Sequence, residues 1–298
     1  MGNTLEAALI SVLSQVDSRF EVVVIDDGST DDSIEKFEKL KKLYPNLRTK
    51  YLQKDPSRTL AETRNISVRE AQGEYCLLHI DCDDIWEPYL IDFINVFHDI
   101  EKLLGEDVLI CGHQVNMGKK SFLLEHGPYK FGHMVEDRDM WYRLALINKF
   151  IPLDHVVFRH RMPLSRKQKW QKKFLLTGKI LSDEIRAGNK FSFYFTNIWR
   201  DYMKHSIELR VYKVLIFPIC FIRAKKLGAI VNSEQLSGWN ELKKIAKDNN
   251  GTVFEVFEKR GAIYNPSALS PAGRWVFSNK ASDCAISELP LNINKPLS

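Results

Sequence analysis

Two apolar runs that each end in a cluster of carboxylates constrain the fold of this chain most. Residues 22–25 are followed by Asp26 and Asp27, and residues 77–80 are followed by Asp81, Asp83 and Asp84. A short run without polar alternation is typical of a parallel strand that is buried on both faces. Because ligands of open α/β sheets bind at the carboxyl ends of the strands, we expect both acid clusters at one edge of a sheet.

Helix and strand patterns alternate over residues 1–150, which predicts an α/β fold with a Rossmann-like, mostly parallel sheet flanked by helices. This first domain is expected to bind the ligand and to carry the catalytic residues. Residues 151–250 are predicted to form a helical extension, which is basic over 158–173. Residues 251–298 are predicted to be an irregular C-terminal tail with short β-like pieces near 253–257.

Charge, cysteines and hydropathy narrow the class of protein. A net charge of +5 is too small to indicate a nucleic-acid partner. The five cysteines are far apart and form no CxxC pattern, so neither a zinc site nor a disulfide framework is indicated, and a reducing cytoplasm fits best. The longest apolar stretch, 211–222, is interrupted by Lys213 and Pro218 and is shorter than the roughly 20 residues that span a bilayer.

The sequence Asp26-Asp27-Gly28-Ser29 predicts a tight turn between a strand and a helix. Gly28 permits a positive φ, and the helix that follows can attract an anion at its N-terminus. An aspartate here can accept hydrogen bonds from a base or a ribose. Alternatively, these side chains only cap the helix, and both interpretations remain open.

Asp81 and Asp83 form a DxD motif at the end of the second strand. If the backbone stays extended, the two carboxylates point the same way and can converge on one cation. Mg²⁺ and Mn²⁺ prefer such hard oxygen ligands and usually share them with phosphate. The alternative is a polar turn with an aspartate cap. His79, inside the strand, is expected to be a hydrogen-bonded core histidine.

Two further positions are candidates for catalysis. Glu136 and Asp137 stand at the start of a predicted helix, where the helix dipole keeps a carboxylate ionised and suited to act as a general base. The guanidinium of Arg64 can clamp a diphosphate. The alternatives are ordinary acidic residues in a solvated first turn and a surface salt bridge.

Five ordered segments of this chain resemble the family 2 glycosyltransferases, which are inverting enzymes with a GT-A fold. The segments are LEAALISVLSQ, EVVVIDDGSTDDS, LAETRN, GEYCLLHIDCDDIW and EDRDMWYRLA. The resemblance implies transfer of a hexose-type sugar from a UDP-, GDP- or dTDP-sugar to a hydroxyl of a glycan or lipid-linked acceptor, such as a cell-envelope polysaccharide. It implies that Asp26, Asp27 and Gly28 contact the nucleotide, that Asp83 binds Mg²⁺ or Mn²⁺ with Asp81 nearer the ribose, and that Asp137 of the Glu136-Asp137 pair is the base.

The chain departs from this family in two ways. Family members begin with an apolar strand before the helix that opens this chain, and the interval between Asp83 and Glu136 is short. The first departure leaves two interpretations. In one, the start of the sequence is misplaced or truncated. In the other, the protein is a shortened, non-catalytic relic that only binds a nucleotide-sugar. The second argues for a small or externally presented acceptor. The basic stretch 158–173 and the segment 211–226 fit either a peripheral contact with the inner face of a membrane or a solvated basic face with a buried helix.

Overall fold

The computed structural model describes residues 2–113, 115–127, 129–130, 136–162, 207–228 and 248–288, with short pieces at 177–179, 181–182, 185–186 and 244–245. The first elements are α1 Gly2–Leu13, β1 Val22–Asp26, α2 Ser33–Leu43, β2 Leu47–Tyr51, α3 Leu60–Glu70, β3 Tyr75–Leu78, β4 Asp84–Trp86 and α4 Leu90–Leu104. The next are β5 Leu109–Gly112, β6 Val115–Lys119, α5 Lys120–His126, α6 Glu136–Leu146, β7 Phe150–Leu153, β8 Arg159–Arg161, α9 Ile207–Leu227, α11 Val253–Glu258 and α12 Pro271–Ser278. The alternation of helices and strands confirms the predicted α/β class.

The strands of the described residues form three sheets: β1-β2, β3-β6-β5-β7 and β4-β8. The pairs β1-β2 and β5-β7 are parallel, whereas β3-β6, β5-β6 and β4-β8 are antiparallel. The sheet structure is therefore mixed, although the sequence pattern predicted a mostly parallel sheet. The reason is that only two residues separate β5 from β6, and so short a connection can join only antiparallel neighbours.

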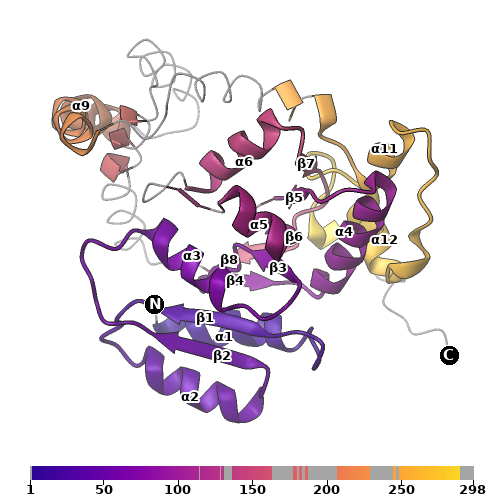
Figure 1. Cartoon of the computed structure of the whole chain (residues 1–298), viewed down its shortest axis with the longest axis horizontal. Helices are drawn as coiled ribbons and strands as arrows, with labels where there is room; N and C mark the ends of the chain where they lie inside the picture. The colour runs from indigo at the N-terminus through magenta and orange to yellow at the C-terminus, as the bar shows by residue number, and fades with distance from the viewer. Residues whose placement is uncertain are drawn as a thin grey trace.

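Helices cover both faces of the four-stranded sheet (Figure 1). On one face, α4 packs with α11 and α12 in a cluster that includes Phe93, Phe97 and Phe277, each with no exposed surface. On the other face, residues of α3, α5 and α6 form a second cluster that includes Val68, Leu123 and Met140. A third, smaller cluster joins α1 and α2 to β1 and β2. The strand ends between these helices hold the candidate site.

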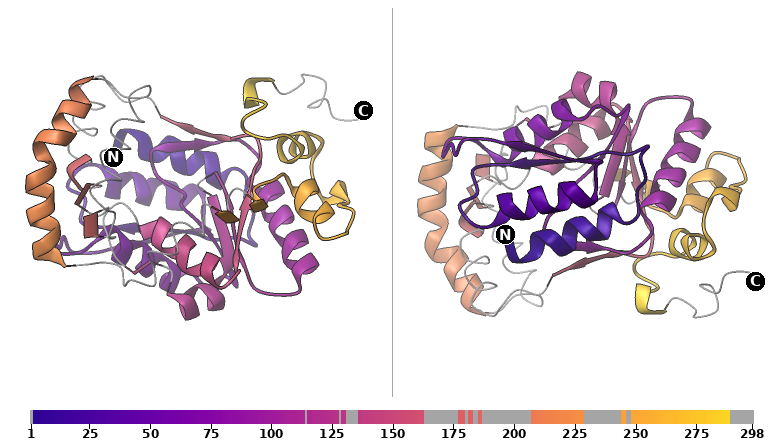
Figure 2. Two further views of the ribbon diagram at one scale, coloured as in Figure 1. Left: turned by 90° about the horizontal axis from the view of Figure 1, so that it is seen from above. Right: turned by 90° about the horizontal axis from the view of Figure 1, so that it is seen from below.

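The prediction of β-like pieces near residues 253–257 is wrong, because this segment is the helix α11. Thr252 and Glu255 form a capping box that satisfies the first main-chain N–H groups of the helix. Val253, Val256 and Phe257 are buried at helical spacing. The described residues of the expected irregular tail thus contribute two helices to the main core, on the far side of the molecule from α9 (Figure 2).

Part of the basic stretch 158–173 also differs from the predicted helical extension. Residues 159–161 form β8, which pairs with β4 directly after the DxD motif. Residues 163–173 lie outside the described part of the chain. The helix α9 follows later and contains Pro218. Among the residues that the structure describes, no helix is long and apolar enough to span a bilayer.

Two predicted strands differ in detail from the observed ones. Residues 22–25 were expected to be buried on both faces, but they are only partly buried, and Asp26 is the buried residue of β1. The second strand was expected over residues 75–80, but β3 ends at Leu78 because His79 adopts a φ of +69°. A positive φ is incompatible with a regular strand.

Candidate active site

The turn after β1 is built around the carboxylate of Asp26. This side chain is 5% exposed, and its Oδ1 accepts hydrogen bonds from the main-chain N–H groups of Gly28 and Ser29, at 3.1 and 3.0 Å. Gly28 has a φ of +74°, and a Cβ at this position would lie 2.6 Å from the Cβ of Lys54. The turn therefore requires glycine, and Asp26 holds its shape.

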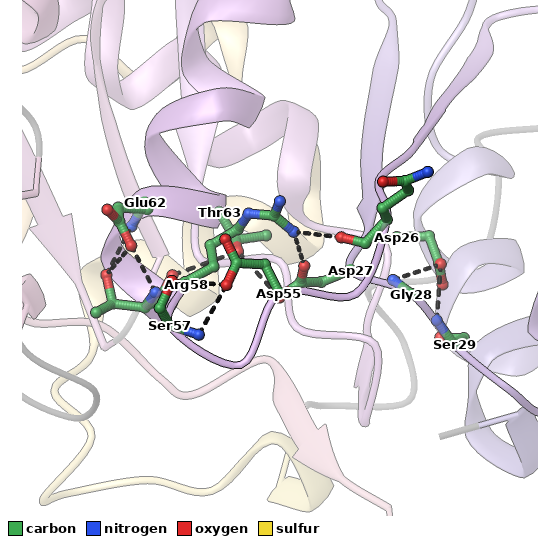
Figure 3. A network of polar contacts seen from close by, with 11 residues as sticks. Asp26, Asp27, Gly28, Ser29, Asp55, Ser57, Arg58, Glu62 and Thr63 are labelled. Atoms are coloured by element: carbon green, nitrogen blue, oxygen red, sulfur yellow. Dashed lines mark hydrogen bonds and ion pairs between the residues drawn. The ribbon is translucent and has the colours of Figure 1, made fainter.

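Asp27 points toward α3 and the loop before it (Figure 3). Its carboxylate accepts a hydrogen bond from the guanidinium of Arg58 and one from the hydroxyl of Thr63, the latter at 3.5 Å. Arg58 also donates to the carbonyl of Gln53 at 3.0 Å. Sequence reasoning missed Arg58, although its position just before the LAETRN segment was a usable signal. Asp27 is thus placed beside the helix that carries Arg64.

Asp81, Asp83 and Asp84 converge: each offers an oxygen that lies within 4.8 Å of those of the other two. They do so through a turn and not through the extended backbone that the DxD spacing suggested. The N–H of Asp84 donates to the carbonyl of Asp81 at 3.2 Å, and β4 begins at Asp84. The predicted convergence of Asp81 and Asp83 is present, but the geometry that produces it is different.

Asp84 is neutralised by arginines from β8. It has no exposed surface, and its Oδ2 accepts a hydrogen bond from Arg159 at 2.6 Å, while Nε of Arg161 lies 3.6 Å from Oδ1. Burial of a carboxylate requires this kind of compensation. Sequence reasoning had assigned these arginines to a basic surface, so it missed their contact with the acid cluster. The ion pair between Asp84 and Arg159 therefore holds β8 next to the acid cluster.

The remaining acids of the cluster suit a divalent cation. Burial raises the pKa of Asp81, the charge of Arg64 lowers it, and the neighbouring Asp84 and Asp83 raise it again. Oxygen ligands on opposite sides of Mg²⁺ lie about 4.2 Å apart, since each is about 2.1 Å from the ion. The oxygens of Asp81, Asp83 and Asp84 lie within 4.8 Å of one another, which is close to this separation. Hard carboxylate oxygens that lie so close together fit Mg²⁺ or Mn²⁺.

Arg64 connects this acid cluster to the start of α6. Its Nη1 donates to Oε1 of Glu136 at 2.6 Å, and its Nη2 lies 3.4 Å from Oδ1 of Asp81. Although burial opposes the charge, the carboxylates of Glu136 and Asp81 hold the pKa of Arg64 above its usual value. One guanidinium thus brings together three segments that the sequence analysis had selected separately.

Glu136 and Asp137 occupy different environments in the first turn of α6. The side chain of Glu136 is 4% exposed, and burial raises its pKa to about 7 despite the opposing charge of Arg64. Asp137 is partly exposed, and its charge acts on both Arg64 and Glu136. Glu136 is therefore engaged in positioning Arg64, whereas Asp137 is the more accessible acid at this end of the site.

His79 is not the fully hydrogen-bonded core histidine that the sequence suggested. The amide of Asn116 lies 2.7 Å from its Nδ1, and its ring stacks on Tyr129 with 5.7 Å between centroids. However, its buried Nε2 has no hydrogen-bond partner within the part of the chain that the structure describes. Burial holds its pKa well below the usual value, so the ring is neutral. Its strained backbone ends β3 and begins the turn that carries the acids.

These features define an α/β protein with a cluster of carboxylates that could hold a divalent cation on one side of a site and a partly exposed acid on the other. Residues 2–143 match the family model described as Glycosyl transferase family 2, and this part of the chain belongs to that family. The resemblance inferred from the five sequence segments is therefore confirmed.

The relatives are similar over limited parts of their length. An uncharacterized glycosyltransferase of Nostoc sp. is 27% identical over 175 residues, which are 52% of this chain and 51% of that protein. One of Rickettsia conorii is 39% identical over 79 residues, which are 26% of this chain and 12% of that protein. The chain thus spans about half or less of the length of these curated relatives.

Two solved structures are similar to this chain. TarS of S. aureus has a TM-score of 0.45 and 18% identity, covering 88% of this chain and 89% of that chain. The mannosyltransferase PcManGT from Pyrobaculum calidifontis, in complex with GDP-Man and Mn²⁺, has a TM-score of 0.44 and 15% identity, covering 83% of this chain and 77% of that chain.

The pKa of Glu136 predicts a pH-dependent stability. Because its pKa is about 7 in the folded protein and near 4.5 when unfolded, the folded state binds more protons between these values. The free energy of unfolding therefore falls as the pH rises from about 4.5 to about 7, by on the order of 2–3 kcal/mol. The Glu136→Gln variant should lack this loss. Urea unfolding at several pH values measures the difference, with Glu125→Gln, an exposed acid on α5, as the control. Parallel profiles for the wild type and Glu136→Gln would contradict the assignment.

Proposed function

We propose that this protein transfers a hexose-type sugar from a nucleotide-diphospho-sugar to a hydroxyl acceptor, with inversion at the anomeric carbon and with a divalent cation. One observation carries the proposal: Arg64 contacts both Asp81, in the acid cluster, and Glu136, next to Asp137. Inverting transfer needs an electrophilic clamp on the leaving-group side and a base on the acceptor side, and it needs no enzyme nucleophile. The geometry supports this division of roles.

On the donor side, Asp83 and Asp81 are the proposed cation ligands, and the turn of Asp26, Asp27 and Gly28 is the proposed nucleotide contact. The cation, when bound, neutralises the charge that develops on the departing diphosphate. Arg64 adds a second positive charge at the same place, and its guanidinium can hold the diphosphate in two directions. The family assignment supports a UDP-, GDP- or dTDP-sugar as the donor.

Removal of a cation ligand should weaken donor binding and slow transfer. We expect a UDP-, GDP- or dTDP-sugar with Mn²⁺ to raise the melting temperature, and Asp83→Asn to abolish this Mn²⁺-dependent shift while lowering the transfer rate roughly 10³-fold. A thermal-shift panel measures the first effect and a radiolabelled transfer assay the second. Glu35→Gln, an exposed acid on α2, is the control. If no donor stabilises the protein, the donor assignment is wrong.

On the acceptor side, Asp137 is the proposed general base. It lies in the first turn of α6, where the helix dipole favours the ionised form. It is partly exposed, as a group must be that meets an incoming hydroxyl. Glu136 is the proposed positioning residue, because its buried carboxylate fixes Arg64 between the two sides of the site.

If Asp137 is the general base, its replacement should affect the rate of transfer and not the affinity for the donor. Asp137→Asn should lower the transfer rate by about 10²–10⁴-fold, because the hydroxyl loses its proton acceptor, and donor affinity should change little. Calorimetry with the donor and Mn²⁺ measures binding, and single-turnover transfer measures the chemical step. Comparable loss of donor affinity would mean that Asp137 belongs to the donor site instead.

Slow hydrolysis of the donor tests the proposed activity without an acceptor, because an enzyme that activates the diphosphate leaving group also hydrolyses its donor. Donor binding without any hydrolysis in the presence of Mn²⁺ would indicate a non-catalytic protein that only binds the nucleotide-sugar.

We propose in addition that α9 binds a membrane surface and so brings the protein to a glycan or lipid-linked acceptor there. Six large apolar side chains on this helix are half exposed or nearly so, namely Val211, Val214, Leu215, Ile219, Ile222 and Leu227. Lys213, Arg223, Lys225 and Lys226 lie among or beside them, with no acid between residues 211 and 227. Exposed apolar residues flanked by basic ones are typical of helices that bind anionic lipid surfaces.

Binding to anionic vesicles tests this contact. The protein should co-sediment with vesicles of phosphatidylglycerol and phosphatidylcholine, and high salt should weaken the binding. The double variant Leu215→Gln, Ile219→Gln should reduce binding roughly tenfold or more, because two apolar contacts are lost. Ile263→Gln, which changes a 96% exposed side chain elsewhere, is the control. Vesicle binding that is absent, or equal in all three proteins, would remove the proposal.

A further inference from the structure

Arg58 forms an ion pair with the carboxylate of Asp27, which the proposed function assigns to the nucleotide. Its Nη1 donates to Oδ1 of Asp27 and, at 3.0 Å, to the carbonyl of Gln53 (Figure 3). The side chains of Arg58 and Asp27 are 18% and 37% exposed, so both groups reach the surface. The strands β1 and β2, which precede the two residues, are parallel, and their carboxyl ends lie at one edge of the sheet. The pair therefore lies at the edge where open α/β sheets bind their ligands.

The loop that carries Arg58 is fixed on both sides of this residue. Before it, Oδ1 of Asp55 accepts hydrogen bonds from the N–H and the hydroxyl of Ser57, at 2.8 and 2.6 Å. The carbonyl of Asp55 accepts a further hydrogen bond from the N–H of Arg58 at 3.1 Å. After Arg58, the side chain of Thr59 caps α3. Local hydrogen bonds therefore position Arg58 independently of its ion pair with Asp27.

The ion pair leaves hydrogen-bonding positions of both side chains unused. A guanidinium has five N–H groups, and Nη1 of Arg58 uses its two on Asp27 and Gln53. Nε and Nη2 of Arg58 have no partner within the part of the chain that the structure describes. A carboxylate offers about four lone-pair positions, and Arg58 and the hydroxyl of Thr63 occupy one on each oxygen of Asp27. One position on each of these oxygens therefore remains for a ligand.

The unused positions are two parallel donors on Arg58 and two acceptors on Asp27. Nε–H and one N–H of Nη2 point the same way along one edge of the planar guanidinium, like the arms of a fork. The two oxygens of Asp27 can accept from two neighbouring N–H groups. A ligand that matches the pair fully needs two adjacent acceptors followed by two adjacent donors. Guanine has this order along its edge, because N7 and O6 accept and N1–H and N2–H₂ donate.

The other bases match the pair less completely. Uracil and thymine present a single N–H between two carbonyl oxygens, so each of the two side chains would gain one hydrogen bond. Adenine and cytosine present one amino group beside a ring nitrogen. An arginine that binds both O6 and N7 is the commonest specific contact with guanine in DNA complexes, and one such pair discriminates against a wrong base by about 5- to 150-fold. The arrangement therefore favours guanine.

We propose that the Asp27–Arg58 pair reads the guanine base of a GDP-sugar donor and that Arg58 determines the choice of nucleotide. This inference rests on the proposed function, because it takes Asp27 as the nucleotide contact. Arg58 donates to O6 and N7, Asp27 accepts from N1–H and N2–H₂, and the ion pair between them stays intact. From Thr59 to Arg64, α3 rises about 7.5 Å. The base site and the diphosphate clamp thus lie at successive places along one helix.

Calorimetry on the unaltered chain, with Mn²⁺ and a set of nucleoside diphosphates, tests the assignment atom by atom. GDP should bind at least about tenfold more tightly than UDP, dTDP or ADP. IDP lacks N2–H₂ and 7-deaza-GDP lacks N7, so each should bind about tenfold more weakly than GDP, because Asp27 or Arg58 loses one partner. Equal binding of GDP and 7-deaza-GDP, or tighter binding of UDP or dTDP, would overturn the proposal.

The variant Arg58→Lys separates base reading from a purely structural ion pair. Lysine keeps a positive charge beside Asp27 but lacks the fork of N–H groups, so the affinity for GDP should fall about tenfold or more while that for UDP changes little. An ion pair with only a structural role would be restored by lysine, and unchanged selectivity for GDP would therefore contradict the proposal. Arg19→Lys, which changes an arginine paired with Asp17 elsewhere on the surface, is the matched control. Melting temperatures of both variants verify that they fold.

The same experiment distinguishes failure of this inference from failure of the proposed function. If UDP or dTDP binds best in the presence of Mn²⁺, the transferase proposal stands and only the guanine assignment is wrong. If none of the nucleoside diphosphates binds, the proposed donor site is wrong, and the role of Arg58 is wrong with it.

Discussion

The guanidinium of Arg64 is the contact on which the organisation of the candidate site depends. It joins an acid of the turn after β3 to a buried acid at the start of α6, which are 17 and 72 residues away in the sequence. The first turns of α3, the helix that carries Arg64, are fixed by hydrogen bonds on both sides of Arg64. Thr59 and Glu62 cap α3, and Asn65 exchanges two hydrogen bonds with the main chain of Tyr129, at 2.6 and 3.1 Å. The capped helix α3 therefore presents Arg64 to both acidic segments.

The acids of the site are distinguished by their surroundings. The carboxylate of Asp26 accepts hydrogen bonds from main-chain N–H groups of its own turn. Asp84 accepts a hydrogen bond from Arg159, and Glu136 accepts one from Arg64. Each of these carboxylates is buried and each is compensated, as burial of a charge requires. Asp27 is exposed and Asp81 and Asp137 are partly exposed, so a ligand can reach these three acids. Asp83 is buried beside Asp81, where a cation held by Asp81 would also meet it.

Local sequence patterns correctly predicted the features of the site that are determined by residues close together in the sequence. The acidic strand ends, the glycine turn at Gly28 and the helix at Glu136 follow from runs, spacing and capping preferences. Features set by long-range pairing were not predictable in this way. The contact of Arg159 with Asp84 spans 75 residues, and His79, which has a φ of +69°, contacts Asn116 across 37 residues. The sequence of α11 contains a recognisable capping box, but its aromatic and β-branched residues are typical of a strand, which led to the wrong prediction.

The spacing between the two acid clusters now has a structural cause. Strands β1 and β3 share no ladder in the described residues, so no main-chain hydrogen bond fixes the distance between Asp27 and Asp81. That distance is set through α3, where Thr63 contacts the first acid and Arg64 the second. A single helix held by side-chain contacts is a weaker constraint than a continuous sheet, because each of its contacts crosses to a separate element.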